Sequence, residues 1–165
     1  TMEVSAKSLK LKKKQSTGKL KVTGMGPGDY VKSWITSDQR IVKVSGGADG
    51  TCTVKAGKKT GKAEITIVLA SGLTKTVKVK VQENTVKTTK ITGVQKKLTI
   101  RKNGKYLLTP VIKPITSGEK VTYSSSNKKV ATVNAKGKIK AKKKGKTVIT
   151  IRSGKEKVKC TVTVK

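Results

Sequence analysis

The chain has 165 residues, of which 33% are apolar and 2% aromatic, so its length allows one domain or two small ones with little core material. Forty Lys and Arg residues stand against eight Asp and Glu, and the resulting net charge of +32 produces a field that attracts polyanions of any kind. The chain has no His and two cysteines, which excludes the usual Cys/His zinc sites and a disulfide framework.

Apolar residues alternate with polar ones along the first half of the chain. Turn signals interrupt this pattern at 26–28, 46–47 and 71–72, and helical spacing is nowhere sustained. Short alternating segments rich in Val, Ile and Thr, with a turn every few residues, are typical of an all-β sandwich or barrel. The pattern predicts strands, in chain order, within segments 9–11, 34–44, 54–56, 65–67 and 76–82.

The second half of the chain repeats the first. Trp34 to Val44 aligns with Tyr123 to Val133 at a constant offset of 89 positions. Further pairs of segments follow in the same order, namely 9–11 with 98–100, 54–56 with 139–141, 65–67 with 149–151, and 77–81 with 160–164. We therefore predict two homologous all-β domains, residues 1–84 and 85–165, joined by a short polar segment at 82–90.

The repeated pattern is W/Y-x-S/T-S-D/N-x-x-V/I-A/V-x-V, followed by a Gly turn, V/I-x-A, a Gly-Lys pair and an I-T-I strand. It resembles the bacterial Ig-like domain, group 2, of intimin- and invasin-type adhesins and Gram-positive surface proteins. Tyr123 to Ile151 matches well, whereas Trp34 to Ile67 has a longer turn at 46–49 and Val42 in place of a small Ala. The resemblance implies two tandem Ig-like β-sandwiches from an extracellular, wall- or membrane-attached bacterial protein, of which this chain is a piece.

The equivalence of the two copies also predicts the core. Apolar residues that recur at matched positions with period two should face inward in both domains. The expected buried residues are Trp34, Ile41, Val44, Ile65 and Ile67 in the first copy, and Tyr123, Val130, Val133, Ile149 and Ile151 in the second.

The segment from Ala135 to Lys146 contains seven lysines, and the role of these lysines depends on the secondary structure of the segment. Ile139 and Ala141 alternate with lysines, which predicts a strand with one dry face and one lysine face rather than a nuclear address. The lysines either bind a polyanion or only keep the domain soluble and its strand edge unpaired. The candidate polyanion-binding residues are Lys138, Lys140, Lys142, Lys143, Lys144 and Lys146.

Other kinds of site find little support in the sequence. Catalysis needs a nucleophile beside a base, a carboxylate pair or a metal, and none is recognisable, so we expect no enzyme and no cofactor. Asp29, Asp38, Asp49 and Glu64 are too few and too separated to predict a calcium cage. Cys52 and Cys160 occupy non-equivalent positions in the repeat, which favours two structural thiols over a disulfide bond.

The apolar runs and the N-terminal residues bear on the cellular location of the protein. No apolar run reaches the roughly 18 residues of a membrane span. No signal peptide is visible, and the Thr1-Met2 start is compatible with one having been removed. We expect a monomer.

Three functions are compatible with these observations. The leading hypothesis is a rigid spacer and adhesion module on a bacterial surface, whose basic face holds an anionic wall polymer or host glycan. The alternative is a carbohydrate-binding module attached to a secreted glycosidase, for which Tyr30 and Tyr106 would be the exposed aromatics. A nucleic-acid binder would have the charge but lacks stacking aromatics and a groove-reading helix.

Overall fold

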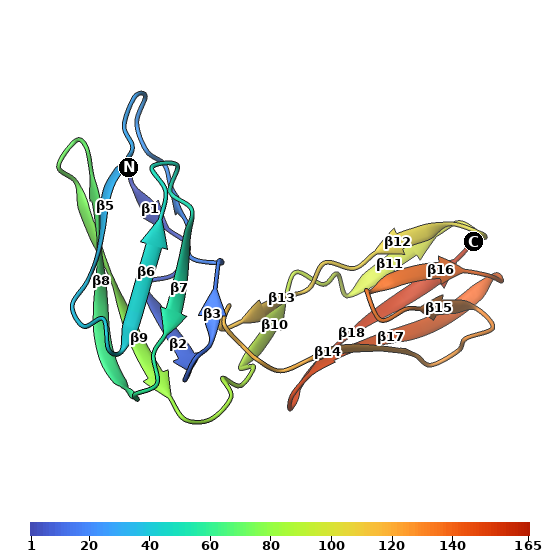
Figure 1. Ribbon diagram of the computed structural model, residues 1–165. Coiled ribbons are helices and arrows are strands. Elements are labelled where there is room, and N and C mark those ends of the chain that lie inside the picture. The colour runs from blue at the N-terminus through green and yellow to red at the C-terminus, as the bar shows by residue number, and fades with distance from the viewer. The chain divides into compact units, whose positions relative to one another are not determined.

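The computed structural model describes residues 1–165, which form two compact units, residues 1–86 and 87–165 (Figure 1). Each unit consists of strands and turns, and the chain contains no helix, which confirms the predicted all-β class. The chain therefore has no helix that is long and apolar enough to cross a membrane.

The first unit is built from three sheets. Its four-stranded sheet has the order β2-β9-β8-β5, its three-stranded sheet the order β3-β7-β6, and β1 pairs with β4. The strands are β1 (Glu3–Val4), β2 (Ser8–Lys12), β3 (Ser16–Thr17), β4 (Val22–Thr23), β5 (Val31–Thr36), β6 (Val42–Gly46), β7 (Cys52–Ala56), β8 (Gly61–Leu69) and β9 (Thr74–Gln82).

The second unit repeats this arrangement strand for strand. Its sheets have the orders β11-β18-β17-β14, β12-β16-β15 and β10-β13. The strands are β10 (Lys90–Thr92), β11 (Lys97–Ile100), β12 (Lys105–Leu107), β13 (Val111–Lys113), β14 (Val121–Ser125), β15 (Ala131–Val133), β16 (Lys138–Ala141), β17 (Gly145–Ser153) and β18 (Glu156–Val164).

The hydrogen-bond register of the first unit recurs in the second at the level of single residues. In both units the second strand runs parallel to the last one, and Leu11 lies beside Val81 as Ile100 lies beside Val164. All other strand pairs within the sheets are antiparallel. The alternation that predicted strands is therefore the alternation between the core side and the solvent side of each sheet.

The core of each unit lies between its two larger sheets. Ile65 and Ile67 in the first unit, and Ile149 and Ile151 in the second, are fully buried. Burial at these period-two positions is the main stabilising term of a fold that has few aromatics. Ile41 and Val130 are also buried, as predicted.

Four of the predicted core residues are only half-buried. Trp34 and Val44 in the first unit, and Tyr123 and Val133 in the second, are partly exposed to solvent. All four lie on edge strands, β5 and β6 or β14 and β15, where no further strand covers the outer flank of the side chain. The period-two pattern gave the correct face of these strands but not their place at the edge.

Candidate anion-binding surface

Strand β16 is the middle strand of its three-stranded sheet and carries the first two predicted lysines. Ile139 and Ala141 are fully buried, whereas Lys138 and Lys140 are exposed on the opposite face. The turn before the strand is fixed by Asn134, whose Oδ1 accepts a hydrogen bond from the Lys138 backbone N–H at 2.9 Å. Strand β16 therefore has the dry face and the lysine face that its sequence predicts.

A third lysine from another strand joins these two. Lys105 of β12 lies directly beside Lys140, and Thr132 of β15 lies on the other side of the same residue. Lys105, Lys138 and Lys140 line a shallow depression of about 390 Å³ together with Thr132 and Asn134. The sequence did not predict a role for Lys105, because β12 and β16 are paired although they lie far apart along the chain. The alternation of polar and apolar residues in Lys105-Tyr106-Leu107 does indicate a strand.

The remaining predicted lysines do not extend this face. Strand β16 ends at Ala141, so Lys142, Lys143 and Lys144 form the connection to β17. The backbone N–H groups of Lys142 and Lys143 both donate to the carbonyl of Val130, at 2.8 and 3.2 Å, and these bonds turn the chain out of the sheet.

Lys146 lies on β17, beside Thr163 of β18, and so belongs to the four-stranded sheet. The six lysines are divided between the two sheets of the second unit and the connection that joins them.

The charge of this surface is not compensated by the protein. All six lysines are exposed, and the ion pairs of the whole chain are Lys13 with Glu83 and Arg40 with Asp38. With 40 basic and eight acidic side chains, most ammonium groups face solvent without a carboxylate in contact. Such a surface favours any flexible polyanion that can contact several lysines at once.

The aromatic residues do not form a flat platform for a sugar ring. The Trp34 ring packs against Gly46, and its Nε1–H donates to the carbonyl of Gly47 at 3.2 Å. The Tyr123 ring packs in the same way against Gly137. Tyr106 packs on the core of the second unit, which leaves Tyr30 as the most exposed aromatic side chain, at 49%.

The aspartates of the first unit hold turns and loops rather than a shared ligand. Asp38 Oδ1 accepts from the Arg40 backbone N–H at 2.8 Å, and the Arg40 side chain lowers the pKa of this carboxyl. Hydrogen bonds from Ser71 likewise lower the pKa of Asp29. Asn127, the counterpart of Asp38, accepts from the Lys129 backbone N–H at 3.1 Å. No three His, Cys, Asp or Glu side chains come together as metal ligands would.

Both cysteines are buried, free thiols. Cys52 donates to the carbonyl of Leu20 at 3.3 Å, and burial raises the pKa of its thiol to about 11. Burial also raises the pKa of Cys160. Because the thiolate is the reactive form, both side chains should be inert in the folded chain.

We expect an aromatic disulfide reagent at pH 8 to leave both thiols unmodified in the native chain and to modify both in denaturant. The raised pKa values keep each thiol protonated at this pH, and burial blocks the reagent. Absorbance of the released thiolate gives the count. Rapid modification of the native chain would contradict the assignment of both residues to the core.

The two units together define an all-β protein of Ig-like β-sandwiches. Residues 81–164 match the family model of the bacterial Ig-like domain (group 2). The chain therefore belongs to the bacterial Ig-like domain (group 2) family, as its repeated pattern predicted. The first unit lies almost entirely outside the matched residues but has the same strand order and pairing as the second.

Comparison with curated proteins gives a match to kappa-carrageenase from Pseudoalteromonas carrageenovora, which is 47% identical over 58 residues. This stretch is 34% of the chain and spans 15% of that enzyme. The match is therefore local and concerns a small part of a longer protein.

Several solved structures are also similar to the chain. Domains 5–6 of the S-layer protein SbsC are 19% identical with a TM-score of 0.49, over 99% of this chain and 97% of that one. Domains 4 and 5 of the same protein are 21% identical with a TM-score of 0.45, over 88% of this chain and 81% of that one. A tri-modular endo-β-1,4-glucanase from Bacillus licheniformis is 12% identical with a TM-score of 0.35, over 99% of this chain and 38% of that one.

Proposed function

We propose that this chain is a non-catalytic, extracellular module of a bacterial surface or secreted protein, which acts as a spacer and adhesion unit with a basic surface for anionic polymers. The observation that carries the proposal is the uncompensated charge: 40 basic side chains face eight acidic ones, with ion pairs at Lys13 and Arg40 alone. Exposed lysines bind a polymer through many contacts at once rather than through one complementary pocket, since each exposed contact contributes little.

The proposed binding residues of the second unit are the six predicted lysines and Lys105, which are distributed over its two sheets and the connection between them. Lys105, Lys138 and Lys140 supply three ammonium groups around one depression, and the connection at 142–144 adds three more next to it in sequence. Lysine presents a flexible point charge without the fixed fork of arginine, so the expected recognition is selective for charge and tolerant of chemical detail.

The spacer role draws support from the sequence of the join. Segment 82–90 is short and contains neither Gly nor Pro, and flexible linkers are typically rich in Gly and Ser. Each flanking unit is a closed sandwich with its own core. Such a pair is suited to hold a neighbouring domain away from the cell.

The test compares binding of the full chain to an anionic wall polymer or heparin with binding of a variant in which the six predicted lysines are changed to Gln. We expect an affinity loss of about tenfold or more for the variant at low salt, from the sum of several weak contacts. Binding of the unmodified chain should also weaken steeply between 0.05 and 0.5 M salt, over which the screening length falls severalfold to about 4 Å.

A matched control removes the same charge elsewhere. Six exposed lysines of the first unit are changed to Gln in that variant: Lys7, Lys19, Lys21, Lys32, Lys58 and Lys59. Equal losses in both variants would mean that net charge alone attracts the polymer, and the proposed surface would then have no special role.

The second candidate function is a carbohydrate-binding module of a secreted glycosidase. The local match to kappa-carrageenase supports it, as does the half-buried Trp34, which lines a depression of about 290 Å³ with Gln39 and Lys43. This reading predicts that an uncharged polysaccharide shifts the Trp34 fluorescence and that salt has little effect. The anionic-polymer reading predicts no shift with the uncharged polymer.

A further inference from the structure

The outer face of the first unit's four-stranded sheet carries a row of three lysines across three neighbouring strands. Lys80 of β9 lies beside Lys10 of β2 in the parallel pair and opposite Lys62 of β8 in the antiparallel pair. All three side chains are exposed. Because adjacent strands are about 4.8 Å apart, this lysine row spans about 10 Å.

The lysine row is unfavourable for folding. Like charges directly opposite each other destabilise a sheet, and none of the three residues has an ion-pair partner. The equivalent positions of the second unit are Thr99, Thr163 and Lys146, in the same register. The fold thus accepts threonine at two of the three positions and does not require the row.

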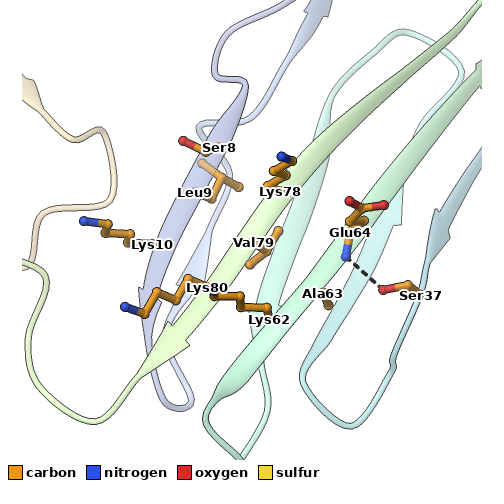
Figure 2. A pocket seen from close by; sticks show the side chains of 10 residues that line it. All are labelled: Ser8, Leu9, Lys10, Ser37, Lys62, Ala63, Glu64, Lys78, Val79 and Lys80. Atoms are coloured by element: carbon orange, nitrogen blue, oxygen red, sulfur yellow. Dashed lines mark hydrogen bonds between the residues drawn. The ribbon is translucent and has the colours of Figure 1, made fainter.

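A groove of about 500 Å³ lies over the lysine row, lined also by Lys78, Ser8, Ser37 and Glu64 (Figure 2). Figure 2 shows Lys10, Lys62 and Lys80 toward one end of the site and Glu64 at the other, where Ser37 Oγ accepts from the Glu64 backbone N–H at 2.9 Å. The groove therefore has three lysines at one end, whereas at the opposite end Glu64 lies beside Lys78 of the paired strand. The aliphatic lysine stems offer apolar surface beside their charged heads.

We propose that the lysine row is a separate anion-binding site, which holds the charged groups of a linear acidic polysaccharide. The row is longer than one sulfate or carboxylate group, so a chain with successive charges fits it better than a single small anion. The groove lacks an aromatic side chain for base stacking and an arginine fork, which disfavours nucleic acid. The inference rests on the proposed function for its ligand class but uses residues of the other unit.

The test replaces Lys10 and Lys80 with the residues that the second unit has at these positions, in the full-chain variant K10T/K80T. Its control is K32T/K55T, which removes two exposed lysines of the same unit that line neither this groove nor the Trp34 depression. Dextran sulfate is the sulfated probe, alginate the carboxylated probe and dextran the uncharged one. Affinities are measured at low salt on chains with native melting curves.

We expect K10T/K80T to bind dextran sulfate about five- to tenfold more weakly than the unmodified chain, and K32T/K55T to change by less than about twofold. Binding of alginate as well would identify the shared oxyanion charge as the recognised feature, and binding of dextran sulfate alone would identify sulfate esters. Equal losses in the two variants would overturn the site, because net charge would then explain both.

The converse variant, T99K/T163K, builds the row in the second unit beside Lys146. We expect its affinity for dextran sulfate to rise by about the factor that K10T/K80T loses, and an unchanged affinity would count against the row. Tighter binding of a single-stranded oligonucleotide than of dextran sulfate would overturn the polysaccharide assignment.

The same series separates this inference from the proposed function. If the six-lysine Gln variant loses binding and K10T/K80T does not, the lysine row is no site while the proposed surface stands. If K10T/K80T loses binding and the six-lysine variant does not, the row stands and the proposed surface fails.

Discussion

Replacement of Ile65 by Ala is expected to lower the free energy of unfolding of the first unit by about 2–5 kcal/mol. Ile65 is fully buried on β8, in the middle of the longest antiparallel pair of its sheet. The change removes apolar contacts and leaves a cavity that the structure can close only in part, because β8 is held by β9 on one side and by β5 on the other.

The measurement uses a denaturant titration followed by the fluorescence of Trp34, the single tryptophan of the chain, which lies on the neighbouring strand β5. The matched control is Ile35→Ala, because Ile35 lies on the same sheet with 51% of its surface exposed. We expect the control to cost less than about 1 kcal/mol, since it loses strand propensity but little burial. Similar costs for the two variants would place the core on the wrong face of the sheet.

The sequence alone was sufficient for the fold class. Alternation around Ile65 and Ile149 identified strands and their inward faces, because burial on one face of a sheet leaves a period-two record in the residues themselves. The Gly turns were readable for a similar reason, since their chemistry is local.

Features that depend on strand neighbours could not be predicted in this way. The exposure of Trp34 and Tyr123 follows from their edge strands, and a single-strand pattern does not record which strand lies at an edge. For the same reason, the sequence does not record that neighbouring lysines lie in different sheets. Lys146 belongs to the same run of residues as Lys140, but it lies in the other sheet.

The converse error concerns residues that are distant in sequence. Lys105 joins Lys140, and Lys10 joins Lys80, only through pairings between strands that lie far apart along the chain. A run of lysines is conspicuous in a sequence, whereas a row of lysines across a sheet is not.

Replacement of Gly50 by Ala is expected to lower the free energy of unfolding of the first unit by about 2–5 kcal/mol, from two separate causes. Gly50 lies in the turn between β6 and β7 with a φ of +88°, a conformation that residues with a Cβ adopt at a cost of about 1–2 kcal/mol. A Cβ at this position would also clash with the backbone carbonyl oxygen of Val22.

This contact cannot be relieved by a side-chain rotation, because the atom that it meets is backbone and is tied to the turn. The Val22 N–H donates to the Gly50 carbonyl at 2.9 Å, so movement of either segment breaks that bond. Forcing an extra carbon into such a packed site costs about 1–3 kcal/mol in addition to the conformational cost.

Gly72 provides the control, because its φ of +90° is nearly the same and a Cβ there would meet no atom within 4 Å. Gly72→Ala should therefore show the conformational cost alone, about 1–2 kcal/mol. The difference between the two variants, read from the Trp34 fluorescence in denaturant, measures the steric part. Equal destabilisation would mean that the turn yields around the new methyl group and that only the backbone conformation requires glycine at Gly50.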